Sequence, residues 1–225
     1  MVVYNAHMCS RFYLIASSAE LKRKFTLDDR PDRVRRYNIA PTQMTPIVVA
    51  AGKTRRFQTG RWGLVPPWSR NLSLAGQMIN APVEEIEEKP AFRAPFSSQR
   101  CLVPASGYYE WRISDANRSP YRIALRAGKP FAFAGLWERW SPEIGDPVET
   151  FTIITTRSNK LLSEVHDRMP AIIAPADYQR WLTGAEPTAK KLLVPYTGAM
   201  TIARVSDRVN DLKQDDATLI APLSA

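Results

Sequence analysis

The sequence predicts an α+β fold: a single compact domain in which a mixed, mostly antiparallel sheet curls into a barrel-like core with short peripheral helices. The chain has 225 residues, of which 44% are hydrophobic, and this suits one globular domain with a substantial core. Segments typical of strands are short and numerous, whereas stretches typical of helices are few. Neither repeats nor low-complexity tracts divide the sequence, so one domain is expected.

Local patterns predict the elements in order. Ser17 and Glu20 form a capping-box pattern, which predicts a short helix that continues to Phe25. Two prolines, Pro66 and Pro67, predict an irregular loop, because proline removes a backbone donor and restricts its predecessor. Strands are expected at 9–13, 46–51, 56–64, 100–104, 108–112, 120–125, 131–137, 149–156, 171–174 and 200–205. Further helices are expected at 84–88, 158–165, 175–181 and 188–193, and an irregular turn at 37–42.

The first residues are treated separately from the domain. Residues 1–7 are too short for a targeting peptide, and His7-Met8 resembles the junction that a cloning site leaves. We therefore expect residues 1–7 to be a cloning-derived or wrongly assigned extension and the domain to occupy residues 8–225.

Charge and composition indicate the class of partner. The chain has 31 Lys and Arg against 22 Asp and Glu, and this net charge of +9 favours nucleic acid. A basic protein kept soluble by its charge is the alternative. Trp68 lies beside Arg70 on the proline loop and is placed either to stack on a base or to pack as a lid on the core; the residues alone favour the lid.

Compartment, cofactors and assembly follow from what the sequence lacks. No apolar run reaches transmembrane length, so we expect no membrane association and a cytoplasmic location, nucleoid-associated when bound to DNA. The two cysteines, Cys9 and Cys101, form no CxxC pair, which is typical of a reducing compartment. With only two histidines, a Cys/His zinc site is not expected, and neither is a cofactor; a monomer is expected.

Glu110 is an acid within an aromatic strand, Gly107 to Trp111, where desolvation of a carboxylate is costly unless it is paired or used. Strand alternation places Tyr108, Glu110 and Arg112 on one face. Glu110 is therefore either an ion-pair partner of Arg112 or a working acid.

Four side chains have the chemistry of a nucleophilic site: Cys9, Asn80, Glu110 and His166. Their spacing in the sequence does not show that they meet. Structural alternatives are a small buried hydrophobe for Cys9, a loop-backbone partner for Asn80 and a helix C-terminal cap for His166.

Eight motifs occur in an order that, taken together, resembles the SOS response-associated peptidase (SRAP) family. They occupy residues 8–12, 37–42, 61–68, 79–81, 89–93, 100–105, 107–111 and 166–170, and the match runs from Met8 to about Leu219.

The resemblance implies a barrel-like curled sheet with a positively charged groove that binds single-stranded DNA. It also implies reaction with abasic sites: removal of the initiator methionine exposes a cysteine, which forms a stable thiazolidine with the sugar aldehyde. It assigns the reactive cysteine to Cys9, the orienting amide to Asn80, the acid to Glu110 and the histidine to His166.

Chemistry is consistent with these assignments. Glu110 would take a proton from the Cys9 amine and return it during loss of water, and His166 would help to open the closed sugar and catalyse reversal. Arg11 would contact phosphate, and the loop with Trp68 and Arg70 would stack on or wedge beside a base.

Departures from the family pattern leave other functions open. Ser10 replaces a usual glycine, and Pro82 stands where many members have an arginine that contacts phosphate. The chain also has residues before Cys9, and an amide nitrogen cannot form a thiazolidine. A cysteine peptidase acting on its own N-terminus and a non-covalent binder of single-stranded DNA are therefore the alternatives.

Overall fold

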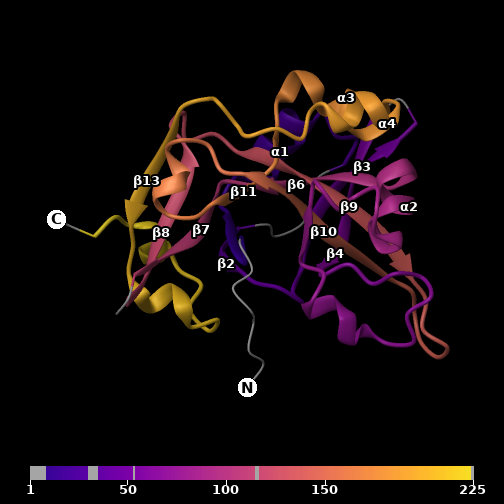
Figure 1. The fold of residues 1–225 in the computed structure, drawn as a ribbon, viewed down its shortest axis with the longest axis horizontal. Coiled ribbons are helices and arrows are strands. Elements are labelled where there is room, and N and C mark those ends of the chain that lie inside the picture. Colours follow the sequence, from indigo (N-terminus) through magenta and orange to yellow (C-terminus); the bar gives the residue numbers. More distant parts are fainter. Residues whose placement is uncertain (1–8, 30–34, 53, 115–116, 224–225) are drawn as a thin grey trace.

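A ring of five paired strands forms the centre of the molecule (Figure 1). The computed structural model describes residues 9–29, 35–52, 54–114 and 117–223. The strands pair in the order β10-β4-β3-β6-β9 and close through β9 and β10; β10–β4 is parallel and the other pairs are antiparallel. They are β3 (Met44–Ala51), β4 (Thr54–Trp62), β6 (Arg100–Ala105), β9 (Phe131–Trp140) and β10 (Val148–Arg157).

Three short strands extend this barrel at the end of β10. Strand β5 (Asn80–Pro82) runs parallel to β10, β11 (Arg168–Pro170) runs antiparallel to it, and β12 (Ile172–Ile173) pairs with β9. Thr155 lies opposite both Pro82 and Pro170, so the same part of β10 holds the segments that follow Asn80 and His166.

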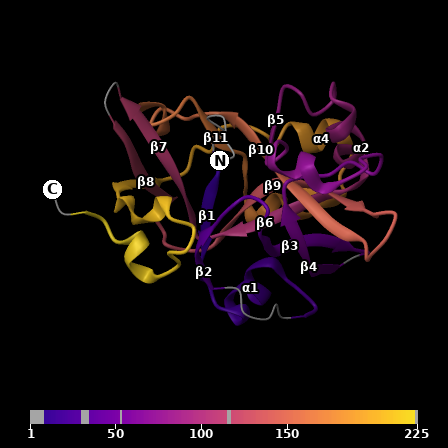
Figure 2. The same cartoon turned by 90° about the horizontal axis from the view of Figure 1, so that it is seen from below.

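A second, antiparallel sheet packs beside the barrel in the order β13-β8-β7-β1-β2. It contains β1 (Arg11–Leu14), β2 (Arg36–Ile39), β7 (Gly107–Ser114), β8 (Asn117–Leu125) and β13 (Met200–Arg204). Figure 2 shows β1 in the middle of the molecule, with β7 on one side and the barrel on the other.

Aromatic rings join β1 and β7 to the barrel. The Phe12 ring centroid lies 5.1 Å from that of Trp62 and 5.9 Å from that of Phe133, both in edge-on arrangements. Tyr108 meets Phe133 in the same way, with centroids 5.8 Å apart. Edge-to-face rings add to the stabilisation from apolar burial, so this cluster fixes the position of the second sheet on the barrel.

Helices are short and peripheral. Ser17 caps α1 (Ser18–Phe25) by accepting the Glu20 N–H at 3.2 Å, as the capping-box pattern predicts. The others are α2 (Pro90–Ser98), α3 (Tyr178–Thr183) and α4 (Glu186–Lys190), with 3₁₀ turns η1 (Leu72–Gly76), η2 (Leu162–Glu164), η3 (Pro175–Asp177), η4 (Asp207–Asn210) and η5 (Ala217–Ile220).

The predicted fold class is confirmed: an α+β domain with a barrel-like core. The expected extension at residues 1–7 lies outside the described residues. No helix among the described residues is long and apolar enough to cross a membrane.

Several local expectations are wrong. Residues 36–39 form a strand instead of a turn, because β1 offers its free edge to them. The acidic stretch 84–88 forms turns, since Ile86 alone among its side chains is buried. The helix begins just after it, at Pro90, a residue suited to the first helical turn. In 158–165, only the turn at Leu162–Glu164 forms.

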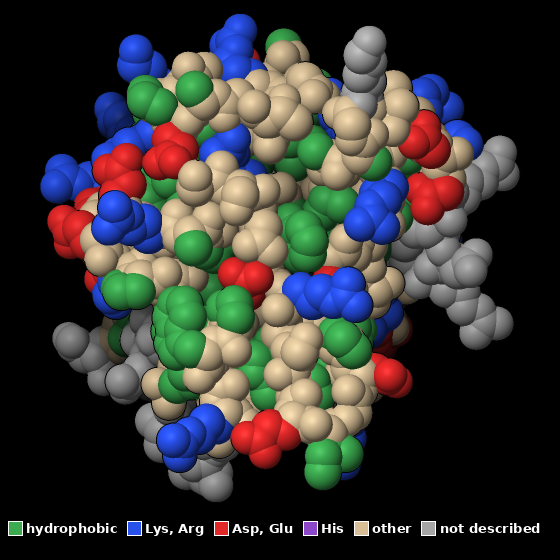
Figure 3. All heavy atoms as spheres, turned by 90° about the vertical axis from the view of Figure 1, so that its right-hand side faces the viewer, with side chains coloured by type: hydrophobic (Ala, Val, Ile, Leu, Met, Phe, Trp, Pro, Cys, Tyr) green, Lys and Arg blue, Asp and Glu red, His purple; other side chains and the backbone are tan. Residues whose placement is uncertain are grey.

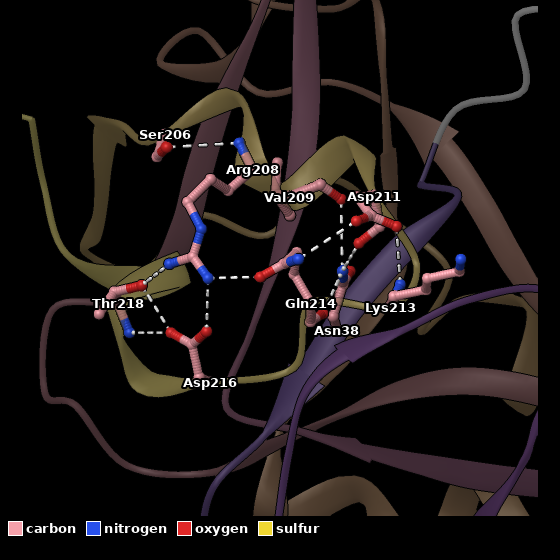
Figure 4. Close-up of polar contacts among 9 residues, drawn as sticks. All are labelled: Asn38, Ser206, Arg208, Val209, Asp211, Lys213, Gln214, Asp216 and Thr218. Atoms are coloured by element: carbon pink, nitrogen blue, oxygen red, sulfur yellow. Dashed lines mark hydrogen bonds and ion pairs between the residues drawn. The ribbon is translucent and has the colours of Figure 1, made fainter.

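The C-terminal segment, residues 205–223, is bound to the second sheet through Asn38 (Figure 4). The buried Asn38 amide donates to the carbonyls of Val209, Asp211 and Gln214. Within the segment, Arg208 donates to the side chains of Gln214, Asp216 and Thr218. These contacts hold the segment beside β1, where it forms one wall of a cavity near Cys9.

The end of the molecule that carries α2 and α4 has basic and acidic side chains interspersed (Figure 3). A single-sign field suited to a phosphate backbone does not cover this face, so the net positive charge is not concentrated there.

Candidate functional site

Cys9 and Glu110 meet in the interior between the two sheets. The Cys9 N–H donates to Glu110 Oε2 at 2.8 Å, and both residues are buried. Strand pairing explains the contact: Arg11 lies opposite Tyr109, so the chain just before β1 passes alongside Glu110. Cys9 has φ of 47°, an uncommon value for a residue other than glycine, and its nitrogen is directed to the carboxylate.

Burial dominates the protonation of Glu110. It raises the pKa of the carboxyl group above its usual value, because the charged form loses its hydration. The backbone N–H of Cys9, a charged His166, the backbone N–H of Trp111 and Arg118 partly oppose this rise in pKa. Glu110 is therefore placed to hold or release a proton closer to neutral pH than an exposed glutamate.

The ion pair between Glu110 and Arg112 does not form among the described residues. Arg112 instead lies with its guanidinium carbon 5.1 Å from the centre of the Tyr121 ring, and it is exposed. Glu110 Oε1 accepts the backbone N–H of Trp111 at 3.1 Å. The Glu110 carboxylate therefore accepts hydrogen bonds from two backbone N–H groups, those of Cys9 and Trp111, instead of pairing with the guanidinium group of Arg112.

The Cys9 thiol is held in its protonated form. Its pKa is raised well above the ordinary value, first by burial and then by the negative charge of Glu110. A thiol in this environment is not a preformed thiolate, in contrast with the low-pKa cysteines of thiol enzymes.

His166 and Asn80 line one cavity of about 540 Å³. His166 Nδ1 accepts the backbone N–H of Arg168 at 3.1 Å and also lies 2.9 Å from the carboxylate of Asp167. The two contacts require opposite protonation of Nδ1. We assign the acceptor role, because the Arg168 N–H is fixed by the backbone whereas the Asp167 side chain is 86% exposed to water. A neutral ring then carries its proton on Nε2.

Arg168 is a site residue that the sequence alone does not single out, although the motif at 166–170 contains it. It donates to both carboxylate oxygens of Glu84, at 2.7 and 2.8 Å, and to the Thr155 carbonyl at 2.9 Å. It lines the cavity beside Pro82 and His166, so a cation is present where Pro82 supplies none.

Arg11, two residues after Cys9 in the sequence, lines a second cavity of about 240 Å³. Its guanidinium donates to Asn38 Oδ1 and to the Val209 carbonyl, each at 2.8 Å. Arg11 and Arg118 both lie over the Trp111 ring, at 5.8 and 4.9 Å from its centre. Ser10 lines the same cavity. Because Arg11, Arg118 and Trp111 also line it, its lining is both basic and aromatic.

Trp68 is 62% exposed, so the expectation of a lid packed on the core is wrong. The adjacent carbonyl of Ser69 accepts the Trp140 Nε1–H at 2.8 Å, which anchors the loop to the barrel. Arg70 is also exposed. Among the described residues, neither Trp68 nor Arg70 hydrogen-bonds to Cys9, Glu110 or His166.

The described residues contain no group of His, Cys, Asp and Glu that could hold a metal ion. The centre of the site is a buried carboxylate that accepts the Cys9 N–H, and a protonated His166 ring would lower the pKa of that carboxylate.

Comparison with known proteins identifies the family. A family model described as SOS response associated peptidase (SRAP) matches residues 8–212. The chain belongs to the SRAP family. This confirms the resemblance carried by the eight motifs.

The relatives of this SRAP chain include proteins named for abasic sites. The abasic site processing protein YoaM of Bacillus subtilis is 39% identical over 221 residues, which cover 95% of this chain and 97% of YoaM. The abasic site processing protein HMCES of Gallus gallus is 26% identical, over 96% of this chain and 78% of its own. A crystal structure of a protein from Bacteroides thetaiotaomicron has a TM-score of 0.86 at 29% identity, covering 96% of this chain and all of that one.

The raised pKa of Glu110 predicts a pH-dependent effect of Glu110→Gln on stability. The folded state holds the carboxyl proton more tightly than the unfolded state, so the parent loses stability as pH rises from about 4.3 through the raised pKa. The Glu110→Gln variant has no carboxyl group at this position, so it does not lose stability in this way. We expect the free energy of unfolding of the variant, relative to that of the parent, to increase between about pH 4 and pH 8 in urea titrations.

Glu84→Gln is the matched control, because Arg168 lowers the pKa of Glu84. Its relative stability should fall a little as pH rises to about 4.3 and then stay level to pH 8, because the lowered pKa of the half-exposed Glu84 lies below that range. A pH-independent difference for Glu110→Gln would contradict the account of the buried carboxyl.

Proposed function

We propose that the protein binds single-stranded DNA and captures abasic sites covalently through Cys9 as the N-terminal residue, forming a thiazolidine. The observation that carries the proposal is the buried carboxylate of Glu110, 2.8 Å from the Cys9 nitrogen. Membership of the SRAP family and the names of the relatives support abasic-site DNA as the substrate.

The reaction needs the Cys9 nitrogen as a primary amine, which the residues before Cys9 prevent in the full chain. The amine adds to the aldehyde carbon of the open sugar, and a proton moves from nitrogen to oxygen to give a carbinolamine. Loss of water gives an imine, and the thiol adds across it: sulfur bonds to carbon and the thiol proton passes to nitrogen. One water is released overall, and the ring closes within one residue, which strongly favours the product.

Glu110 is suited to the proton transfers of this sequence. It already accepts a hydrogen bond from the Cys9 nitrogen, and its raised pKa suits a group that takes a proton and returns it. His166, with Nε2 carrying the proton of the neutral ring, would act on the sugar oxygen during ring opening and reversal. Asn80 lines the cavity of His166 and would orient the terminal residue or the sugar.

The state of the thiol favours capture over peptidase chemistry. A thiol peptidase depends on a thiolate stabilised by a positive partner, whereas burial and the charge of Glu110 raise the pKa of Cys9. Thiazolidine closure has no such requirement, because the activated imine carbon accepts the thiol as its proton leaves. The peptidase alternative therefore takes second place.

The DNA contacts proposed for Trp68, Arg70 and Arg11 differ in kind. Trp68 and Arg70 are exposed on an anchored loop and are free to meet a base and a phosphate. Arg11 is bonded to Asn38 and Val209, so its charge would act on a phosphate from a fixed position.

The test of the proposal compares two forms of the protein with single-stranded DNA that carries one abasic site. The form that begins at Cys9 should give a heat-stable adduct whose intact mass is the sum of the components less one water. The full chain should give none, because its Cys9 nitrogen is an amide. Mass spectrometry of the denatured products measures both outcomes.

Two variants sharpen this test. Cys9→Ala in the shortened form should lose the heat-stable adduct and keep at most a reversible imine, while His166→Ala should reach the same product more slowly. A stable adduct from the full chain with its first eight residues still attached would refute the thiazolidine chemistry. Unchanged rates of formation and reversal in His166→Ala would remove His166 from it.

Trp68→Ala should weaken binding to intact single-stranded DNA by about 5- to 150-fold, since stacking of a base on an aromatic ring is worth ~1–3 kcal/mol. Fluorescence anisotropy measures this loss. Ile144→Ala is the control, because Ile144 is an exposed hydrophobic residue on the β9–β10 turn. Equal affinities for parent and Trp68→Ala would exclude stacking on Trp68.

A further inference from the structure

The hydroxyl of Tyr108 is buried and, among the described residues, hydrogen-bonds to nothing. Buried polar side-chain atoms are nearly always paired, because leaving a donor without water or a partner costs free energy. The roles proposed for Cys9, Glu110, His166 and Asn80 in thiazolidine formation do not involve this hydroxyl.

Its position is beside the reacting groups. Tyr108 precedes Glu110 by two residues on β7, so both side chains leave the same face of the strand, with Cα atoms about 7 Å apart. Phe12 lies opposite Tyr108 on β1, three residues after Cys9. The Tyr108 ring packs edge-on against Phe133, which restrains the ring that carries the hydroxyl.

Electrostatics place the same group near both Cys9 and Glu110. Burial raises the pKa of Tyr108 well above its ordinary value, and negative charge on Cys9 or Glu110 raises it further. The phenol is therefore un-ionised at neutral pH, and it remains a hydrogen-bond donor. Hydroxyls of Thr45, Thr152 and Tyr178 are also buried without a partner in the described part of the chain, but charges on Cys9 and Glu110 are not among the causes that shift the pKa of Tyr178.

We propose that the Tyr108 hydroxyl donates a hydrogen bond to the oxygen of the abasic-site aldehyde while the Cys9 amine adds to it. This inference rests on the proposed function and deepens it. The aldehyde carbon bonds to the Cys9 nitrogen and so takes the place in the bond sequence that the Met8 carbonyl carbon holds in the full chain. Its oxygen is then two bonds from a nitrogen that lies 2.8 Å from Glu110 Oε2, and Glu110 is two residues from Tyr108 on β7.

The donor acts on the oxygen at the step where charge develops. As nitrogen adds to the carbonyl carbon, electrons move to oxygen, and Tyr108 stabilises that charge while the proton arrives from nitrogen through Glu110. The oxygen then leaves as water with a second proton, which Glu110 delivers and which the same nitrogen gives up as the imine forms. A fixed donor in a buried site stabilises such charge more than it stabilises the neutral carbonyl group, so it lowers the barrier.

Tyr108→Phe tests this role, because it removes the hydroxyl and keeps the ring against Phe133. In the form that begins at Cys9, we expect the crosslinking rate at saturating abasic-site DNA to fall about a hundred- to a thousand-fold. The DNA concentration at half-maximal rate should not change. The thermal midpoint should not fall, since an unpaired buried hydroxyl stabilises nothing.

Tyr109→Phe is the matched control on the other face of β7. The Tyr109 hydroxyl donates to the Tyr37 carbonyl at 2.8 Å, so this variant should unfold at a lower temperature and crosslink at the parental rate.

Three results would overturn the inference. They are an unchanged rate in Tyr108→Phe beside a reactive parent, a rate loss accompanied by a lower thermal midpoint as in Tyr109→Phe, and a change in half-saturating concentration alone. In each of these the parent still crosslinks, so the proposed function stands. A parent that forms no adduct overturns both.

Discussion

The hydrogen bond from the Cys9 nitrogen to the Glu110 carboxylate is the constraint on which the rest of the site depends. It joins residues 101 positions apart and lies in the interior, where an ionised carboxylate is costly. The protein offsets that cost with backbone N–H donors from Cys9 and Trp111, with the nearby charge of Arg118 and, when its ring is protonated, with that of His166. None of these removes the rise in pKa, so the carboxyl group remains able to exchange a proton.

The fold brings this bond about by packing β1, a strand of the second sheet, against the barrel. β1 pairs with β7, which carries Glu110, while the Phe12 ring packs against Trp62 and Phe133 of the barrel. On the barrel side, β10 holds β5 and β11 together, which brings Asn80 and His166 to one cavity. On the other side, Asn38 binds the C-terminal segment over the cavity that contains Arg11. Ser10 and Arg11 at the start of β1 line the second of these cavities, and each cavity has an arginine in its lining.

The sequence predicted features that depend on local patterns. Alternation on β7 placed Tyr108 and Glu110 on one face and Tyr109 on the other, and the two tyrosines do lie in different hydrophobic clusters. The capping pattern at Ser17 located α1. The helix after Pro90 was missed because the acidic run before it resembles a helix start, although its side chains make no apolar stripe. Exposure of Trp68 depends on the path of a proline loop, which periodicity does not describe.

The site was predicted as a set of residue types and not as a geometry. Cys9, Glu110 and His166 were named from chemistry and family motifs, whereas the contact between Cys9 and Glu110 comes from a strand register that no local signal encodes. The unpaired hydroxyl of Tyr108 is equally invisible in sequence, because only the packed interior shows that it has no partner among the described residues. Arg168 belongs to the motif at 166–170, but its place beside Pro82 follows from the pairing of β11 and β5 with β10.

The central claim is that the carboxyl group of Glu110 moves the proton of the Cys9 amine. The most direct measurement is the pH dependence of the crosslinking rate at saturating abasic-site DNA, for the form that begins at Cys9 and for its Glu110→Gln variant. The account predicts two ionisations in the parent: that of the α-amine, near its ordinary pKa of about 7.7–8.0, and that of a carboxyl group above about 4.3. The variant should be slower and keep the amine ionisation alone. Profiles of equal height and shape for the two proteins would contradict the account.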